Sequence, residues 1–325
     1  MSGRKPNILL LCNSRMAVPS LQYLQQDGFL AAIAVPDLHD FVHEPFRALA
    51  IDAAIPFTTL HKASYTTQVA QLLQVHQSDA VFVIGFPWKI PATLLGIPVH
   101  GFLNFHGGLL PEMRGRDPLF ESIRQRKPQT GLTVHQMDAG LDTGPVIRRE
   151  ILELSPETTH GMLSSHIAFA CEKVCREIVP MMADNMPLEA TPQDETLAMY
   201  WPEPDKASLT IDWQTMDSLD IKALIKACNP LLKGALTRLE HWTFGITDVT
   251  DLNLDGDTSQ LEPGRILYAD PQQGLIIYCK DKRALRLDVV YTDEGYFPGY
   301  KLAQLGLRPG LLLGNTVPAL TTQFS

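Results

Sequence analysis

Apolar residues gather in short runs over the first 185 residues of this chain, and longer amphipathic stretches separate these runs. The runs have the length and composition of strands that are covered on both faces: Ile8–Cys12, Phe29–Val35, Phe57–Leu60 and Asp79–Gly85. Helix candidates lie between and after them: Val18–Gln25, Phe46–Ala53, Ser64–His76 and Thr158–Met182. Strands that alternate with helices predict an α/β fold with an open, mostly parallel, Rossmann-like sheet and helices on both faces.

The composition changes after residue 185, where residues 186–205 are rich in proline and poor in aliphatic side chains. This segment is predicted to be a linker. Beyond it, short alternating runs predict a small antiparallel β-barrel of the OB-like kind: Pro263–Ile266, Gly274–Lys280 and Ala284–Val290. The expected organisation is a catalytic domain over residues 1–185, the linker, and a C-terminal barrel domain over residues 206–325.

Two segments of the first domain place polar side chains at the end of an apolar stretch. Asn104 and His106 are two residues apart, so in a strand they project from the same face. The segment Thr130–Ile147 likewise runs into an acid beside glycine, Asp142. A histidine, an amide and a carboxylate are the components of a general acid/base site with an oxyanion donor. Asn104, His106 and Asp142 are therefore the candidate catalytic residues.

The order of short motifs in this region extends the interpretation. Asn104-x-His106 is followed by Leu-Leu-Pro, Arg-Gly, Thr-Gly-x-Thr-Val-His and Leu-Asp-Thr-Gly, and this series resembles the folate-dependent formyltransferase family. That family includes methionyl-tRNA, glycinamide ribonucleotide and amino-sugar formyltransferases. The resemblance, strongest from Asp79 to Leu152, implies transfer of a formyl group from 10-formyltetrahydrofolate to a primary amine. One departure is Gly108, where the family usually has serine, which implies more room beside His106 or a more mobile loop.

The resemblance also implies a pterin pocket in the loop that follows the strand at Asp79–Gly85. A flat polar heterocycle suits an apolar slot with a few directed hydrogen bonds. The folate-binding candidates are Phe86, Trp88, Lys89 and Ile90, with Asp138 and Leu141 on the opposite wall. Core packing is the alternative for the apolar members of this loop.

Four residues are candidates for contact with the amine acceptor: Arg15, Gly108, Arg114 and Arg116. Arg15 lies near a predicted helix N-terminus, where backbone N–H groups also attract anions. Arg114 and Arg116 are placed to meet phosphate or carboxylate, or to brace the loop that carries them.

Charge argues against a tRNA acceptor. The 325 residues carry a formal net charge of −9. The loop Pro36–Pro45, where methionyl-tRNA formyltransferases typically carry a basic insertion, has three acids and neither lysine nor arginine, so it would repel phosphates. These features favour a small-molecule amine, first a nucleotide-linked amino sugar. Formylation of an amino acid, an aminoacyl carrier or methionyl-tRNA is the alternative, and a 10-formyltetrahydrofolate hydrolase is the alternative of another class.

Other site types and targeting signals are not favoured. The five cysteines form no close Cys-x-x-Cys pair and are expected to be buried thiols. His39 and His43, with two aspartates nearby, are interpreted as an acidic surface loop, so no metal is expected. The apolar core near the N-terminus is too short for a signal peptide, and no run approaches the roughly 20 residues that span a bilayer. A cytoplasmic protein without a membrane partner is predicted, and a homodimer is left open.

Overall fold

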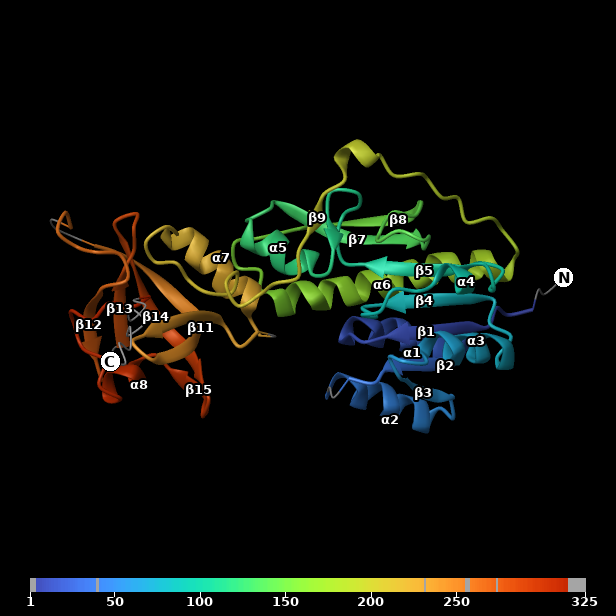
Figure 1. The fold of residues 1–325 in the computed structure, drawn as a ribbon, viewed down its shortest axis with the longest axis horizontal. Helices are drawn as coiled ribbons and strands as arrows, with labels where there is room; N and C mark the ends of the chain where they lie inside the picture. Colours follow the sequence, from blue (N-terminus) through green and yellow to red (C-terminus); the bar gives the residue numbers. More distant parts are fainter. Residues whose placement is uncertain (1–3, 39–40, 231, 255–257, 273, 315–325) are drawn as a thin grey trace, which may run out of the picture. The chain divides into compact units, whose positions relative to one another are not determined.

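The structure is a computed structural model that describes residues 4–38, 41–230, 232–254, 258–272 and 274–314. The chain forms two compact units (Figure 1). The first contains residues 1–118, 129–153 and 163–203, and the second contains residues 119–128, 154–162 and 204–325. Each unit is built around its own sheet.

The sheet of the first unit has seven strands in the order β3-β2-β1-β4-β5-β7-β8. The strands are β1 (Ile8–Cys12), β2 (Leu30–Pro36), β3 (Phe57–Leu60), β4 (Ala80–Ile84), β5 (Phe102–His106), β7 (Gln129–Gln136) and β8 (Val146–Glu153). The strands from β3 to β5 pair in parallel, whereas β7 is antiparallel to both β5 and β8. The predicted mostly parallel Rossmann-like sheet is therefore confirmed.

Helices cover both faces of this sheet (Figure 1). They are α1 (Val18–Gln26), α2 (Glu44–Asp52), α3 (Tyr65–Val75), α4 (Ala92–Leu95) and α6 (His160–Ala183), with short 3-10 turns at Arg15–Ala17 and Phe41–His43. One layer of the core joins Leu9 and Val81 of the sheet to Val69 of α3. On the other face, the guanidinium of Arg176 in α6 lies 4.3 Å from the ring centre of Tyr23 in α1. Because successive side chains of a strand point to opposite faces, strands covered in this way need apolar residues at every position, as β1 has.

Residues 186–203 belong to the first unit and pair with it at two places. Thr191 forms an antiparallel bridge with Val146. A short strand β9 (Tyr200–Trp201), which follows a 3-10 turn at Glu195–Leu197, pairs in parallel with β6 (Arg114–Gly115). Most of the segment predicted as a linker is thus attached to the first unit by main-chain hydrogen bonds.

The second unit contains a six-stranded antiparallel sheet. Its strands are β10 (Ala235–Leu239), β11 (Trp242–Asn253), β12 (Ile266–Asp270), β13 (Gly274–Tyr278), β14 (Arg283–Thr292) and β15 (Gly295–Pro298). The helices assigned wholly or mainly to this unit are α5 (Pro118–Arg124), α7 (Ser218–Cys228) and α8 (Tyr300–Gln304). Trp213 is buried and donates its indole hydrogen to Thr237 at 2.9 Å. The antiparallel C-terminal architecture agrees with the predicted barrel-like domain.

The remaining expectations concern the cysteines, metal ligands and membrane-spanning helices. All five cysteines are buried and free, as predicted. Within the described ranges no group of three or more His, Cys, Asp or Glu side chains is arranged to hold a metal ion. His39 and Asp40, which belong to the histidine-containing acidic loop, lie outside the described residues. No helix in the part of the chain that the structure describes is long and apolar enough to cross a membrane.

Candidate active site

Strand β5 carries the first two residues of the candidate site. Asn104 and His106 lie two residues apart in β5. β7 runs antiparallel to β5, and the register places His135 of β7 directly opposite Asn104. Side chains that face each other across a strand pair are close enough to interact. His135, which was not among the candidates from the sequence, therefore belongs to the site.

His135 acts as a neutral hydrogen-bond acceptor for Asn104. Its Nδ1 lies 3.2 Å from the carbonyl oxygen of Gln136, which requires the hydrogen on Nδ1. The other ring nitrogen, Nε2, accepts from the Asn104 amide nitrogen at 3.1 Å. Burial, assisted by the charge of the neighbouring His106, lowers the pKa of His135 to about 4, so the ring is uncharged near neutral pH. This bond fixes which way the Asn104 amide faces.

His106 is held by a main-chain carbonyl. Its Nε2 donates to the carbonyl oxygen of Met113 at 2.6 Å, so in the neutral ring Nδ1 carries the free lone pair. The ring is 6% exposed. Nδ1 lies 3.8 Å from a carboxylate oxygen of Asp142, which is beyond hydrogen-bond range but close enough for a strong charge interaction. The ring therefore offers one nitrogen as a base, next to an acid.

Asp142 lies at the centre of the group. Its φ of 57° is in the left-handed region, which aspartate tolerates better than most residues. One carboxylate oxygen accepts from the backbone N–H of Gly115 at 3.0 Å. The other lies 3.4 Å from the amide nitrogen of Asn104 and 3.8 Å from Nε2 of His135. The fold thus brings Asn104, His106 and Asp142 together, as the sequence predicts.

The shifted pKa of His135 predicts a pH dependence of the free energy of unfolding. In the unfolded chain the pKa of this histidine returns to about 6.5, whereas in the folded chain it is about 4. Between these values the unfolded chain binds a proton that the folded chain does not, so stability is lost as the pH falls from 6.5 to 4. The loss should be no more than about 3.4 kcal/mol.

This prediction is measured by urea unfolding between pH 4.5 and 7.5. As the pH falls, the free energy of unfolding of the wild type should decrease more than that of His135→Gln, because the variant lacks the histidine whose pKa is lowered on folding. Parallel pH curves for the two proteins would show that His135 is not held neutral in the folded state.

The loop after β4 places aromatic side chains at the predicted pterin wall. The ring centres of Trp88 and Phe86 are 5.5 Å apart, edge to face, and those of Trp88 and Tyr65 are 5.1 Å apart. Lys89 is exposed, and its carbonyl accepts from the Tyr65 hydroxyl at 2.7 Å. Ile90 is only 1% exposed and packs into the core, so its side chain lies in the core layer. Phe86 and Trp88 are half-buried and also pack against this core layer, so only their exposed parts offer apolar surface to a flat ring.

The residues predicted for the opposite wall form a tight turn. One carboxylate oxygen of Asp138 accepts from the Gly140 N–H at 2.9 Å and from the Thr143 hydroxyl at 2.6 Å. Leu141 lies within this turn and is half exposed. Asp138 therefore shapes the turn that presents Asp142, while Leu141 offers apolar surface.

The four acceptor candidates differ in exposure. Arg15 is exposed, and Arg116 is half exposed, bonding to Glu203 at 2.9 Å and to the carbonyl of Pro87 at 3.2 Å. Arg114 is completely buried, and its guanidinium bonds to Glu195 and Gln193. Gly108 lies beside His106: a Cβ added there would be 3.0 Å from Nε2 of that ring. The structure thus separates the surface arginines from Arg114.

Comparison with known proteins agrees with the motif series. Residues 39–179 match the family model described as formyl transferase. The chain is 31% identical over 239 residues to the methionyl-tRNA formyltransferase of Pseudomonas putida, a match that covers 73% of each protein.

Solved structures share the fold at low identity. HypX from Aquifex aeolicus, solved with tetrahydrofolic acid, superimposes with a TM-score of 0.64 at 14% identity over 92% of this chain. The match covers 47% of HypX, so the chain spans about half of that protein's length. WlaRD, a sugar 3N-formyltransferase solved with dTDP and 5-N-formyl-THF, gives a TM-score of 0.63 at 16% identity. That match covers 87% of this chain and 97% of WlaRD.

Proposed function

Because the chain belongs to the folate-dependent formyltransferase family, we propose that it transfers the formyl group of 10-formyltetrahydrofolate to the α-amino group of methionyl-tRNA. The enzyme class and the formyl donor follow from the family. The observation that carries the acceptor is the 31% identity, over 73% of both proteins, to a methionyl-tRNA formyltransferase. WlaRD shares only the fold, at 16% identity, and does not favour a sugar acceptor to the same degree.

The prediction that tRNA is an unlikely partner is wrong in the light of this relative, a methionyl-tRNA formyltransferase. It rested on the net charge of −9 and on the acidic loop after β2. Net charge averages over the whole surface, whereas contact with the end of a tRNA depends on a few cations near the site. In the described part of that loop, a carboxylate oxygen of Asp37 lies 2.7 Å from the ring of His61.

Three exposed cations in neighbouring loops of the first unit support an anionic acceptor. Arg15 follows β1, Lys89 follows β4 and Arg116 follows β6. Neighbouring contacts join these loops: Arg116 bonds to the carbonyl of Pro87, and Ser14 lies against Gly85. In parallel sheets, ligands bind outside the carboxyl ends of the strands, which is where the loops of Arg15 and Lys89 lie. Phosphates of a tRNA end would meet the charges of Arg15 and Lys89 there, whereas Arg116 would have to exchange its ion pair with Glu203 for a phosphate.

We assign to His106 the role of accepting the proton of the attacking amine. An amine must lose a proton when it attacks the formyl carbon, and Nδ1 of His106 carries the free lone pair, since Nε2 donates to Met113. The imidazolium that results would lie beside the Asp142 carboxylate, with 3.8 Å between Nδ1 and the nearest carboxylate oxygen. The new carbon–nitrogen bond replaces the bond to N10 of the folate, and the proton held by His106 passes to that departing nitrogen.

We assign to Asn104 the stabilisation of the negative charge that develops on the formyl oxygen. One of its two amide hydrogens is directed at His135, with a nitrogen–nitrogen distance of 3.1 Å. The other makes only a long contact of 3.4 Å to Asp142, so this hydrogen is the one available to an oxyanion. The exposed apolar surface of Leu141 and the Phe86–Trp88 pair would hold the pterin ring at this point.

The proposal is tested by following the conversion of 10-formyltetrahydrofolate to tetrahydrofolate by absorbance with four separate additions. These are methionyl-tRNA, free methionine, an amino-sugar nucleotide and buffer. Acceleration by methionyl-tRNA, with formylmethionine recovered after deacylation, is the expected result. Turnover with the amino-sugar nucleotide alone would overturn the acceptor, and formate release in buffer alone would indicate a hydrolase.

Serine at position 108 is expected to lower kcat/KM for transfer at least about tenfold. A Cβ there would lie 2.9 Å from the Met113 carbonyl oxygen and from Cβ of Pro118, as well as 3.0 Å from Nε2 of His106. The hydrogen bond of 2.6 Å between His106 and Met113 must then lengthen or shift. Misplacing a reacting group by about 1 Å can cost on the order of 10² in rate.

The matched control for Gly108→Ser is Gly96→Ser. A Cβ at Gly96 would meet no atom within 4 Å, and its φ of −92° suits any residue. Gly96→Ser should keep wild-type kinetics and melting temperature. Equal rates for the two variants would mean that the space beside His106 does not matter for catalysis.

A further inference from the structure

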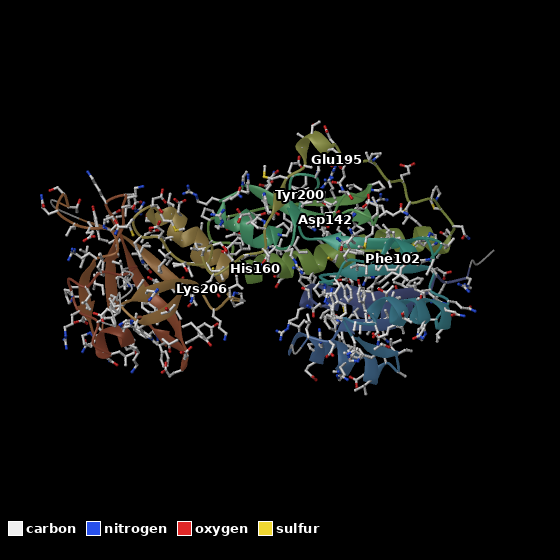
Figure 2. All side chains as sticks on the ribbon, viewed as in Figure 1. Phe102, Asp142, His160, Glu195, Tyr200 and Lys206 are labelled. Carbon is white, nitrogen blue, oxygen red and sulfur yellow. The ribbon has the colours of Figure 1, made fainter. Side chains whose placement is uncertain are left out.

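Residues 186–203, which we call the strap, touch the catalytic turn as well as the edge of the sheet. Gln193 of the strap donates its side-chain amide to two backbone carbonyls, those of Asp142 at 2.8 Å and Gly144 at 2.7 Å. Further along, the hydroxyl of Tyr200 lies 3.3 Å from the carbonyl oxygen of Leu141. Figure 2 shows Tyr200 next to Asp142, with Glu195 beyond it. The main chain on both sides of the candidate catalytic acid is therefore held by the strap.

Arg114 holds the strap in turn. Its guanidinium donates to the Gln193 side-chain oxygen at 2.9 Å and makes a two-pronged pair with Glu195 at 2.7 and 2.9 Å. The same group donates to the Tyr200 hydroxyl at 3.1 Å and faces its ring. Arg114 is fully buried, and its N–H groups donate to three strap residues. They are therefore directed at the strap and not at an external anion.

The two ends of this network meet at the Asp142 carboxylate. Gly115, next to Arg114 in β6, donates its N–H to one oxygen of that carboxylate at 3.0 Å. Gln193 holds the backbone of the same aspartate from the other side. Since Asp142 adopts a left-handed backbone conformation, its turn depends on such external bonds to keep one geometry.

We propose that Gln193 and Arg114 are positioning residues that hold the Asp142 carboxylate beside His106, an inference that rests on the proposed function. Neither side chain touches the reacting atoms. Each acts by fixing the turn that presents the acid, and loss of either leaves the carboxylate free to move away from the 3.8 Å separation.

Gln193→Glu is the most selective variant for a kinetic test. It keeps the size of the side chain and an acceptor for Arg114, but it replaces the donor with a second oxygen that faces two carbonyls. We expect kcat to fall about ten- to a hundredfold, with the KM for methionyl-tRNA changed less than about threefold. Glu189→Gln, an exposed position on the same strap, should behave as the wild type. A rise in KM at constant kcat would overturn the positioning role.

A double variant tests whether Gln193 acts through Asp142. In the background of Asp142→Asn, the further change Gln193→Ala should lower kcat by less than about twofold, although it costs more than tenfold alone. Multiplicative losses would show that the two residues act independently and would overturn the proposal.

Hydrogen exchange gives a readout that does not need turnover. The Gly115 N–H is bonded to the Asp142 carboxylate, so its exchange should accelerate at least about tenfold in Gln193→Ala and stay unchanged in Glu189→Gln. Unchanged exchange at Gly115 would refute the positioning role even if the acceptor is methionyl-tRNA. If the wild type transferred no formyl group but Gln193→Ala still showed faster exchange at Gly115, the proposed function alone would be refuted.

Discussion

Replacing His106 by glutamine is expected to lower kcat/KM for formyl transfer by about 10² to 10⁴. Glutamine can still donate to the Met113 carbonyl in place of Nε2, so the local fold loses little. It offers no basic nitrogen at the position of Nδ1, so the attacking amine has no group to receive its proton. The measurement is steady-state release of tetrahydrofolate over a range of methionyl-tRNA concentrations, which gives kcat/KM.

The control for this variant is His166→Gln, an exposed position on α6. It should leave kcat/KM within about twofold of the wild type, and both variants should keep their melting temperatures. Turnover by His106→Gln close to that of the wild type would remove His106 from the mechanism, because the reaction would then proceed without a basic nitrogen at this position.

The sheet was largely predictable from the sequence because burial on two faces leaves a strong signal. β1 and β4 are completely buried, and each is a run of apolar residues without interruption. β6 and β9 left no such signal, since each is two residues long and their partners are far apart in the chain. Two residues carry no periodicity, so only the folded structure reveals that the predicted linker pairs with the first unit.

The site was predictable where it depends on the local chain. The common face of Asn104 and His106 follows from strand geometry alone. His135 was missed because its place opposite Asn104 depends on the antiparallel register of β5 and β7, which apolar pattern does not set. The burial of Arg114 was missed for a related reason: arginine is rarely buried without a partner, and its partner Glu195 is 81 positions away.

Removing the amide of Asn104 is expected to lower kcat by about 10² to 10³, equivalent to about 3 to 4 kcal/mol of transition-state stabilisation. The test variant is Asn104→Leu, which has a similar volume and no donor. Because the charge on the formyl oxygen develops only in the transition state, the KM for the folate should change little. Equal losses in binding and turnover would instead assign Asn104 to ground-state binding.

His135 gives this prediction an internal control, since its ring orients the Asn104 amide. His135→Phe keeps an aromatic ring in the buried position but removes the acceptor, so the amide is free to rotate and kcat should fall about tenfold. In the double variant with Asn104→Leu there is no amide left to orient, and the rate should equal that of Asn104→Leu alone within about twofold. A further tenfold loss in the double variant would mean that His135 acts on the substrates by a separate route, most directly through Asp142, whose carboxylate lies 3.8 Å from its ring.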